Sequence, residues 1–340
     1  MRENYEEDKW QQALCQELQR VRAWIGPRQI TTIFFGGGTP SLMHPKTIEA
    51  VINQASQLFT GIEQAEITLE ANPNSVEVEK FQGLAKAGVN RISIGVQSLR
   101  PERLQSLGRK HNVEEAIKAI HTAQSTFKRV SFDLIYATPD QTLEEWQQEL
   151  EQALAFGTEH LSLYQLTIEP NTTFERLHAQ GSLILPVDDL TADMYELTNT
   201  LCAAQGLQAY EVSNYAKLGA ECKHNLVYWR YGEYIGVGPG AHGRLVVDGK
   251  RYATKQYRTP ERWLKESTRD EECLGLSLSE QEQERILMGL RTTEGICWDK
   301  PLTKKIEVLM NEGFLTHINN RLITTAKGRL VLQAVLQYIF

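Results

Sequence analysis

Short apolar runs recur along the first 216 residues of the chain, separated by segments of mixed polarity. The runs are rich in β-branched and aromatic residues and are mostly continuous, which is typical of strands covered on both faces. Apolar positions in the intervening segments recur every three or four residues, which indicates amphipathic helices. We predict strands over 30–35, 66–71, 91–96, 129–137, 160–167 and 209–213, and helices over 45–59, 75–87, 113–127, 143–155 and 188–205.

This alternation of strands and helices predicts parallel βαβ units, and therefore an α/β protein. The fold that we expect for residues 1–216 is a parallel (β/α) barrel, complete or partial. Ligands of such a barrel bind beyond the carboxyl ends of its strands. Residues that directly follow the apolar runs are therefore candidates for a binding site.

The chain opens with a predicted helix, in which Trp10, Leu14, Leu18, Val21 and Ile25 recur at helical spacing. A βα repeat that begins with a helix lacks its first strand. Without that strand, the run at 30–35 has an unpaired apolar edge, which soluble proteins avoid. We therefore expect that the first strand is missing from this chain, through truncation or a late start. The alternative is that the N-terminal helix covers the edge.

Two further segments follow the βα region. Residues 217–276 contain a glycine-rich loop and, around Asp248-Gly249, a predicted hairpin turn. Residues 277–340 read as two helices, a hairpin at Asn319-Asn320 and a final helix, which predicts a winged-helix-like α+β domain. The net charge of this last segment is only +1, so it lacks the basic footprint of a DNA-binding domain.

Composition limits the remaining classes of protein. The net charge of −7 argues against general binding to nucleic acid or to anionic membranes. No apolar run reaches the roughly 20 residues that a transmembrane helix needs. The five cysteines are scattered, without a CxxC pair, which favours a reducing cytoplasm.

The three glycines at 36–38 come directly after the first apolar run. Glycine allows the backbone to approach a ligand closely and to adopt positive φ, although a tight turn alone would also explain it. Polar residues follow the later strands in the same way. A carboxylate there can accept hydrogen bonds from ribose hydroxyls, and an arginine can bind a carboxylate. The set comprises Glu70, Gln97, Arg109 and Asp133.

Many separate motifs occur in the order found in one known family. They include FFGGGTPSLM, ITLEANP, RISIGVQSL, LGRKHN, DLIYATPDQT, YEVSNYA and HNLVYW…GVGPGAH. The chain resembles the oxygen-independent coproporphyrinogen oxidase family of radical S-adenosylmethionine (SAM) proteins over nearly its whole length. This resemblance implies a partial barrel of the radical SAM type. It also implies a SAM site formed by Gly37, Gly38, Thr39, Glu70, Gln97, Arg109, Asp133 and Thr167.

The stretch His224-Asn225-Leu226-Val227-Tyr228-Trp229 matches the HNxxYW signature of the haem-chaperone branch of that family. The resemblance implies haem binding by His224, Asn225, Tyr228 and Trp229, with His224 as the candidate iron ligand. A histidine can ligate haem iron, and aromatic rings offer flat apolar surface to a porphyrin. Cys222 and His242 are weaker candidates for the ligand, and a purely structural histidine is the alternative.

The chain departs from the family in one respect. The family holds a [4Fe–4S] cluster with a CxxxCxxC motif, and this motif is absent from the sequence. Such a cluster requires cysteine thiolates. We therefore expect neither cluster assembly nor reductive cleavage of SAM by this chain as written.

Three functions follow for comparison. The first is a haem chaperone that delivers haem to haem-requiring proteins, among them respiratory ones, with a homodimer left open. The second is an enzyme that oxidatively decarboxylates coproporphyrinogen III. The third is a DNA-binding regulator, which the near-neutral C-terminal segment disfavours. The resemblance supports the first.

Overall fold

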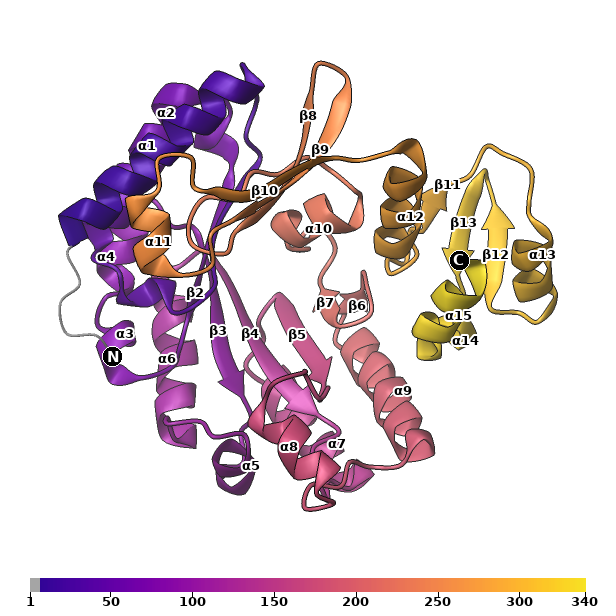
Figure 1. The fold of residues 1–340 in the computed structure, drawn as a ribbon. Coiled ribbons are helices and arrows are strands. Elements are labelled where there is room, and N and C mark those ends of the chain that lie inside the picture. The colour runs from indigo at the N-terminus through magenta and orange to yellow at the C-terminus, as the bar shows by residue number, and fades with distance from the viewer. Residues whose placement is uncertain (1–6) are drawn as a thin grey trace.

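The computed structural model describes residues 7–340 and contains one large, open, mainly parallel sheet (Figure 1). The strand order is β1-β2-β3-β4-β5-β7-β6. The first five strands are parallel and follow one another in space as they do in sequence. They are β1 (Thr32–Phe35), β2 (Glu66–Ala71), β3 (Arg91–Gln97), β4 (Arg129–Tyr136) and β5 (His160–Gln165). The predicted α/β fold with a partial barrel is confirmed.

Helices cover one face of this sheet and enclose the main apolar core. They begin where the sequence offers capping groups, such as the reciprocal caps Asn112–Glu115 and Thr142–Glu145. Their apolar stripes pack onto strand residues such as Ile92 and Phe132, which are fully buried. The helices that connect the parallel strands are α2 (Pro45–Leu58), α3 (Ser75–Val78), α4 (Phe81–Lys86), α5 (Pro101–Ser106), α6 (Val113–Thr126) and α7 (Leu143–Leu154).

The opposite face of the sheet, which we call the inner face, is polar. Successive strand side chains point to opposite faces, so the burial of Ile92, Ile94 and Val96 under the helices places their neighbours on the inner face. On β3 these neighbours are Arg91, Ser93, Gly95 and Gln97. The inner face therefore carries small and charged side chains in place of a second apolar layer.

Three predicted elements differ from the structure. The single final helix predicted after the Asn319-Asn320 hairpin is two helices, α14 (Ala326–Leu330) and α15 (Leu332–Ile339). The helix predicted over 75–87 is two short helices, α3 and α4, with Glu79 and Lys80 between them. The strand predicted over 209–213 is wrong. The chain instead turns there between β6 (Gln208–Ala209) and β7 (Asn214–Ala216), which pair antiparallel. The buried Glu211 carboxylate stabilises the turn by accepting hydrogen bonds from the Ser213 amide and the Asn214 side chain.

Strand β1 forms one edge of the described sheet and pairs there only with β2. The N-terminal helix α1 (Glu7–Ile25) packs chiefly against α2. The helix that contacts β1 is α10 (Lys223–Trp229), and it does so through His224. The side chain of His224 lies against Phe34, so α10 covers part of the inner surface beside this edge.

Two smaller antiparallel sheets complete the described chain. Strands β8 (His242–Val247), β9 (Lys250–Gln256) and β10 (Asp270–Gly275) cross above the large sheet, followed in Figure 1 by the C-terminal part on the right. The expected hairpin turns are present, with positive φ at Asp248, Gly249, Asn319 and Asn320. The second sheet has the order β11-β13-β12. Its strands are β11 (Ile296–Cys297), β12 (Leu315–Ile318) and β13 (Arg321–Thr324).

The remaining helices are α8 (Thr173–Ala179), α9 (Asp188–Ala204), α11 (Pro260–Lys265), α12 (Leu278–Gly289), α13 (Lys304–Asn311), α14 (Ala326–Leu330) and α15 (Leu332–Ile339). The C-terminal helices enclose a core of their own around Leu290, Trp298 and Leu322. None of the helices in residues 7–340 is long and apolar enough to cross a membrane.

Candidate functional site

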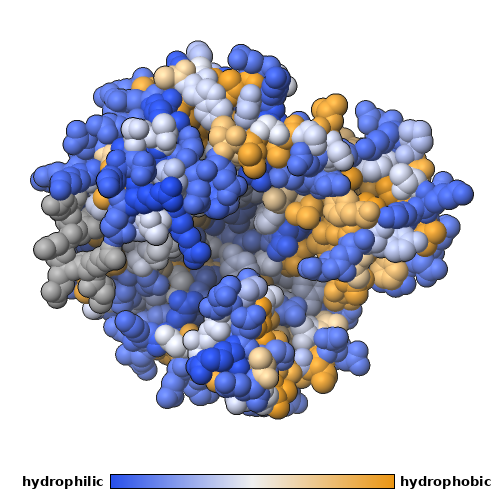
Figure 2. All heavy atoms as spheres, in the orientation of Figure 1, coloured by the Kyte–Doolittle hydropathy of each residue, from blue (hydrophilic) through white to orange (hydrophobic). Residues whose placement is uncertain are grey.

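A cavity of about 260 Å³ opens at the carboxyl ends of the parallel strands. Figure 2 shows the molecule hollowed on this face, between the β8–β10 sheet and α8. Seven of the eight residues predicted to bind SAM line the cavity: Gly37, Gly38, Thr39, Glu70, Gln97, Arg109 and Asp133. The structure thus brings together residues from four strand ends that span almost 100 positions of sequence.

A chain of hydrogen bonds fixes three of these side chains. Arg109 donates to Oε1 of Gln97 at 2.9 Å, and Nε2 of Gln97 donates to the Asp133 carboxylate. The backbone of Gln97 has φ of +69°, a left-handed conformation that costs energy for a residue with a Cβ. Strain held by a hydrogen-bonded side chain is typical of functional sites, and here it directs Gln97 between Arg109 and Asp133.

Burial raises the pKa of both carboxyl groups of the cavity. Removal from water raises the pKa of Asp133 to about 7, against the opposing effect of its hydrogen bond from Gln97. Burial also raises the pKa of Glu70, which accepts a 3.2 Å hydrogen bond from the Gly37 amide. Such carboxylates gain from a cationic or hydroxyl-bearing ligand, since the ligand replaces the lost water.

The glycine loop leaves space for that ligand. Gly37 has φ of +104°, and no atom lies within 4 Å of the place where a Cβ of Gly37 or Gly38 would stand. The ammonium, carboxylate and ribose groups of SAM match the carboxyl, guanidinium and amide groups of the lining. The residues present therefore fit SAM.

The eighth predicted residue, Thr167, does not line the cavity. It lies beyond the end of β5, is exposed, and donates a 3.3 Å hydrogen bond to Glu169. Sequence reasoning missed other lining residues, namely Asn72, Ser93, Gly95, Ser162 and Tyr164. Small polar residues alternate with buried apolar ones along β3, and this pattern could have identified Ser93 and Gly95.

The HNLVYW segment forms α10, at the opposite end of the strands from the cavity. The His224 ring stacks on Phe34, with ring centroids 4.7 Å apart. Its Nδ1 lies 2.9 Å from the Thr32 hydroxyl, and its Nε2 lies 2.7 Å from the Tyr228 hydroxyl. Burial, followed by the charge of Arg91, lowers the pKa of His224 to about 4. The imidazole is therefore neutral at pH 7, the form that binds iron, but both of its nitrogens are engaged.

The other residues of the motif have different surroundings. Tyr228 contacts His224 and Tyr234 edge to face. Asn225 donates a long hydrogen bond, 3.4 Å, to the Tyr210 hydroxyl. Trp229 has an indole N–H without a partner in the described chain, and the Arg291 guanidinium lies 4.8 Å from its ring centroid. Trp229 thus faces the C-terminal part rather than the ring of His224.

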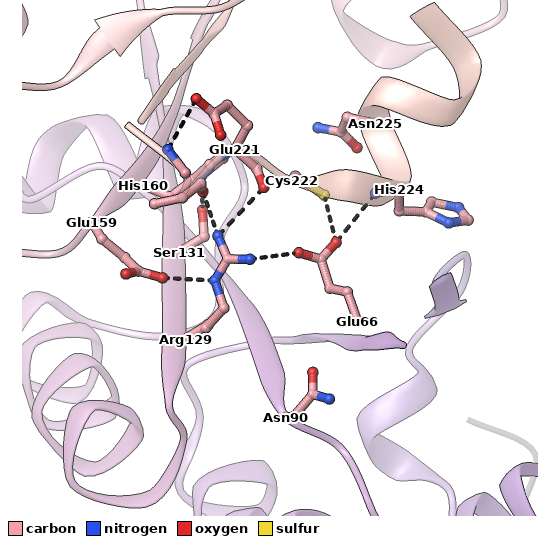
Figure 3. A network of polar contacts seen from close by, with 12 residues as sticks. Glu66, Asn90, Arg129, Ser131, Glu159, His160, Glu221, Cys222, His224 and Asn225 are labelled. Atoms are coloured by element: carbon pink, nitrogen blue, oxygen red, sulfur yellow. Dashed lines mark hydrogen bonds and ion pairs between the residues drawn. The ribbon is translucent and has the colours of Figure 1, made fainter. Parts of the chain in front are cut away.

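A buried ion pair anchors the start of α10 (Figure 3). Glu66 accepts hydrogen bonds from Arg129 at 2.9 Å and from the His224 amide at 3.2 Å. The Cys222 thiol lies 3.6 Å from the same carboxylate, and burial raises the pKa of this thiol. Cys222 is accordingly a buried thiol held by Glu66, and His242 is exposed at the start of β8.

The cysteines do not form a metal site. Cys15, Cys202, Cys222, Cys273 and Cys297 are all free and lie on different elements. Among residues 7–340, no group of three or more His, Cys, Asp or Glu side chains could hold a metal ion. These residues do not fit a [4Fe–4S] cluster, which needs converging thiolates.

Comparisons with known proteins agree with this fold and motif pattern. A family model described as the radical SAM superfamily matches residues 8–153. The haem chaperone HemW of Escherichia coli (strain K12) is 38% identical over 342 residues, which cover 97% of this chain and 89% of that protein. The mitochondrial radical S-adenosyl methionine domain-containing protein 1 of Mus musculus is also 38% identical, over 97% of this chain and 80% of its own length.

A solved structure shows the same fold. Coproporphyrinogen III oxidase (HemN) from Escherichia coli superposes with a TM-score of 0.80 at 20% identity, over 99% of this chain and 84% of that one. The chain is thus a protein with the radical SAM fold. The chain belongs to the HemW family within this superfamily.

Proposed function

We propose that this protein binds haem as cargo and hands it to haem-requiring proteins, among them respiratory ones, in the cytoplasm. The observation that carries the proposal is α10, where His224 and Tyr228 of the HNxxYW motif of a chain in the HemW family lie together, with His224 against Phe34 on the inner face of the sheet. A neutral His224 beside the aromatic rings of Phe34 and Tyr228 supplies an iron ligand and flat apolar contacts.

Haem binding through His224 requires one local exchange. Both ring nitrogens already have a partner, and the Tyr228 hydroxyl contacts Nε2. We infer that iron replaces this hydroxyl at Nε2, while Thr32 continues to orient the ring through Nδ1. A ligand exchange of this kind suits a carrier, because Tyr228 can return to Nε2 when the haem leaves.

We further propose that SAM binds in the cavity at the strand ends. Gly37, Gly38 and Thr39 would contact it through backbone groups, and Glu70, Gln97, Arg109 and Asp133 through their side chains. Bound SAM supplies a sulfonium group, whose reductive chemistry depends on an iron–sulfur cluster. The role that we assign to the cavity in this chain is binding and structural support for the inner face.

The second candidate, oxidation of coproporphyrinogen III, requires that cluster. The described cysteines do not supply its ligands, so we propose no such reaction for this chain.

A transfer assay tests the carrier function. The chain is loaded with one equivalent of haem and mixed with the apo form of a haem-requiring acceptor, and the Soret band is followed. We expect stoichiometric transfer to the acceptor, and a His224→Ala chain that cannot be loaded. His242→Ala, an exposed histidine outside the motif, is the matched control and should behave as the wild type. Haem that stays on the wild-type chain in the presence of excess acceptor would contradict the proposal.

A further inference from the structure

Two buried polar side chains lie next to each other on the inner face without partners. Thr68 on β2 and Arg91 on β3 are Cα partners in the parallel ladder. Thr68 is 0% exposed and its Oγ1 has no hydrogen-bond partner in the described chain. Arg91 is 2% exposed, and no hydrogen bond or ion pair joins its guanidinium to another residue within 7–340. A serine or threonine hydroxyl and a guanidinium can together donate several hydrogen bonds to one anion.

An unpaired buried charge is costly, and the neighbouring arginine shows the usual solution. Arg129, the next residue along this row of the sheet, forms ion pairs with Glu66 and Glu159. The carboxylates of Glu66 and Glu159 are therefore already paired with Arg129. At the amino ends of these strands, Arg91 is therefore left without a carboxylate of its own among the described residues, whereas Glu70 and Asp133 lie further along the same face in the cavity. The Arg91 guanidinium calls for a counter-ion supplied from outside the chain.

The same row connects the two parts of the site. Towards the carboxyl end of β3, Ser93 and Gly95 follow Arg91 on the same face and line the cavity. Towards the sheet edge, Phe34 is the Cα partner of Thr68, and the His224 ring stacks on Phe34. Thr68 and Arg91 thus lie between the α10 aromatic residues and the cavity.

We propose that Thr68 and Arg91 form a carboxylate-binding site that holds a propionate side chain of a tetrapyrrole. This inference rests on the proposed function. The guanidinium of Arg91 can bind both carboxylate oxygens, and the Thr68 hydroxyl can donate a further hydrogen bond. The aromatic rings of Phe34 and His224, one position away, would meet the apolar macrocycle. A flat apolar ring with carboxylate arms matches this arrangement of groups.

Titrations with haem and with haem dimethyl ester, whose propionates are neutral, test the site. The wild-type chain should bind haem about 10- to 100-fold more tightly than the ester, the usual range for hydrogen bonds to a charged group. Arg91→Met should abolish this preference by weakening haem binding alone. Thr68→Val, which keeps the shape of the side chain, should reduce the preference about 3- to 10-fold.

Thermal unfolding of the ligand-free chains gives a second readout. Both variants remove an unpartnered buried group, so their melting temperatures should equal or exceed that of the wild type. If either residue had a structural role, its variant would have a lower melting temperature than the wild type. Equal affinity of the wild-type chain for haem and ester, or destabilisation by both substitutions, would overturn the carboxylate site alone. A wild-type chain that binds neither compound would contradict the proposed function as well.

Discussion

The raised pKa of Asp133 leads to a specific expectation for stability. Burial raises this pKa from 3.8 to about 7, so the folded chain holds a proton there that the unfolded chain releases above pH 4. The contribution of this group to stability is therefore present at low pH and is lost as the pH rises towards 7. The substitution Asp133→Asn removes the titration while keeping a polar side chain that Gln97 can contact.

The size of the effect follows from the shift. Between pH 5 and pH 7, a carboxyl group whose pKa rises from 3.8 to about 7 on folding lowers the free energy of unfolding by about 2.3 kcal/mol, because the slope of 1.36 kcal/mol per pH unit halves as the group reaches its folded pKa. Asp133 lines an open cavity and is only partly shielded from water, which reduces this figure to about 1–2 kcal/mol. Over this range, the free energy of unfolding should fall by that much more in the wild type than in Asp133→Asn.

Urea denaturation at several pH values between 5 and 8 measures the difference. Asp140→Asn, which changes an exposed carboxylate, is the matched control and should follow the wild-type pH profile. Parallel profiles for wild type and Asp133→Asn would refute the assignment of the proton to Asp133. A wild type that gains stability relative to the variant as pH rises would refute its sign.

Three further expectations concern the cavity, the ion pair and the histidine. In Gly95→Val the new Cβ would make only ordinary contacts, the nearest at 3.5 Å, and the methyl groups should fill part of the cavity. Calorimetry should therefore show loss of SAM binding without a lower melting temperature. Arg129→Met leaves the Glu66 carboxylate buried and unpaired, so it should lower the free energy of unfolding in urea by about 3 kcal/mol. Arg230→Met, at an exposed ion pair, should lower it by less than about 1 kcal/mol. Equal losses would contradict the difference in burial between the two pairs. Because the pKa of His224 is about 4, its iron bond should survive to about pH 5 in a Soret titration, and loss near pH 6.5 would contradict a buried neutral imidazole.

Local patterns in the sequence were sufficient to predict the parallel part of the sheet. The segments 66–71 and 91–96 correspond to β2 and β3, and their apolar residues alternate with polar ones because helices cover only one face of these strands. The polar residues after those runs were predictable as one site for a related reason, since parallel strands end at a common edge of the sheet.

Long-range contacts account for what the sequence did not predict. The turn at 210–213 depends on Glu211, whose carboxylate binds Arg291 at 2.6 Å across 80 positions of sequence. The position of α10 over Phe34 depends on contacts between residues almost 200 positions apart, such as Thr32 with His224. Nothing in the sequence indicates that Arg91 lacks an ion pair, because only the structure shows that Glu66 is already paired with Arg129.

In the proposed function, haem binds to the inner face through His224 on α10. The most direct test is a haem titration followed at the Soret band, for the wild-type chain and for His224→Ala and His242→Ala. Haem binding through His224 predicts saturation at about one haem per chain for the wild type and His242→Ala, with a histidine-ligated spectrum that is lost in His224→Ala. An unchanged titration and spectrum in His224→Ala, or no saturable binding by the wild type, would contradict it.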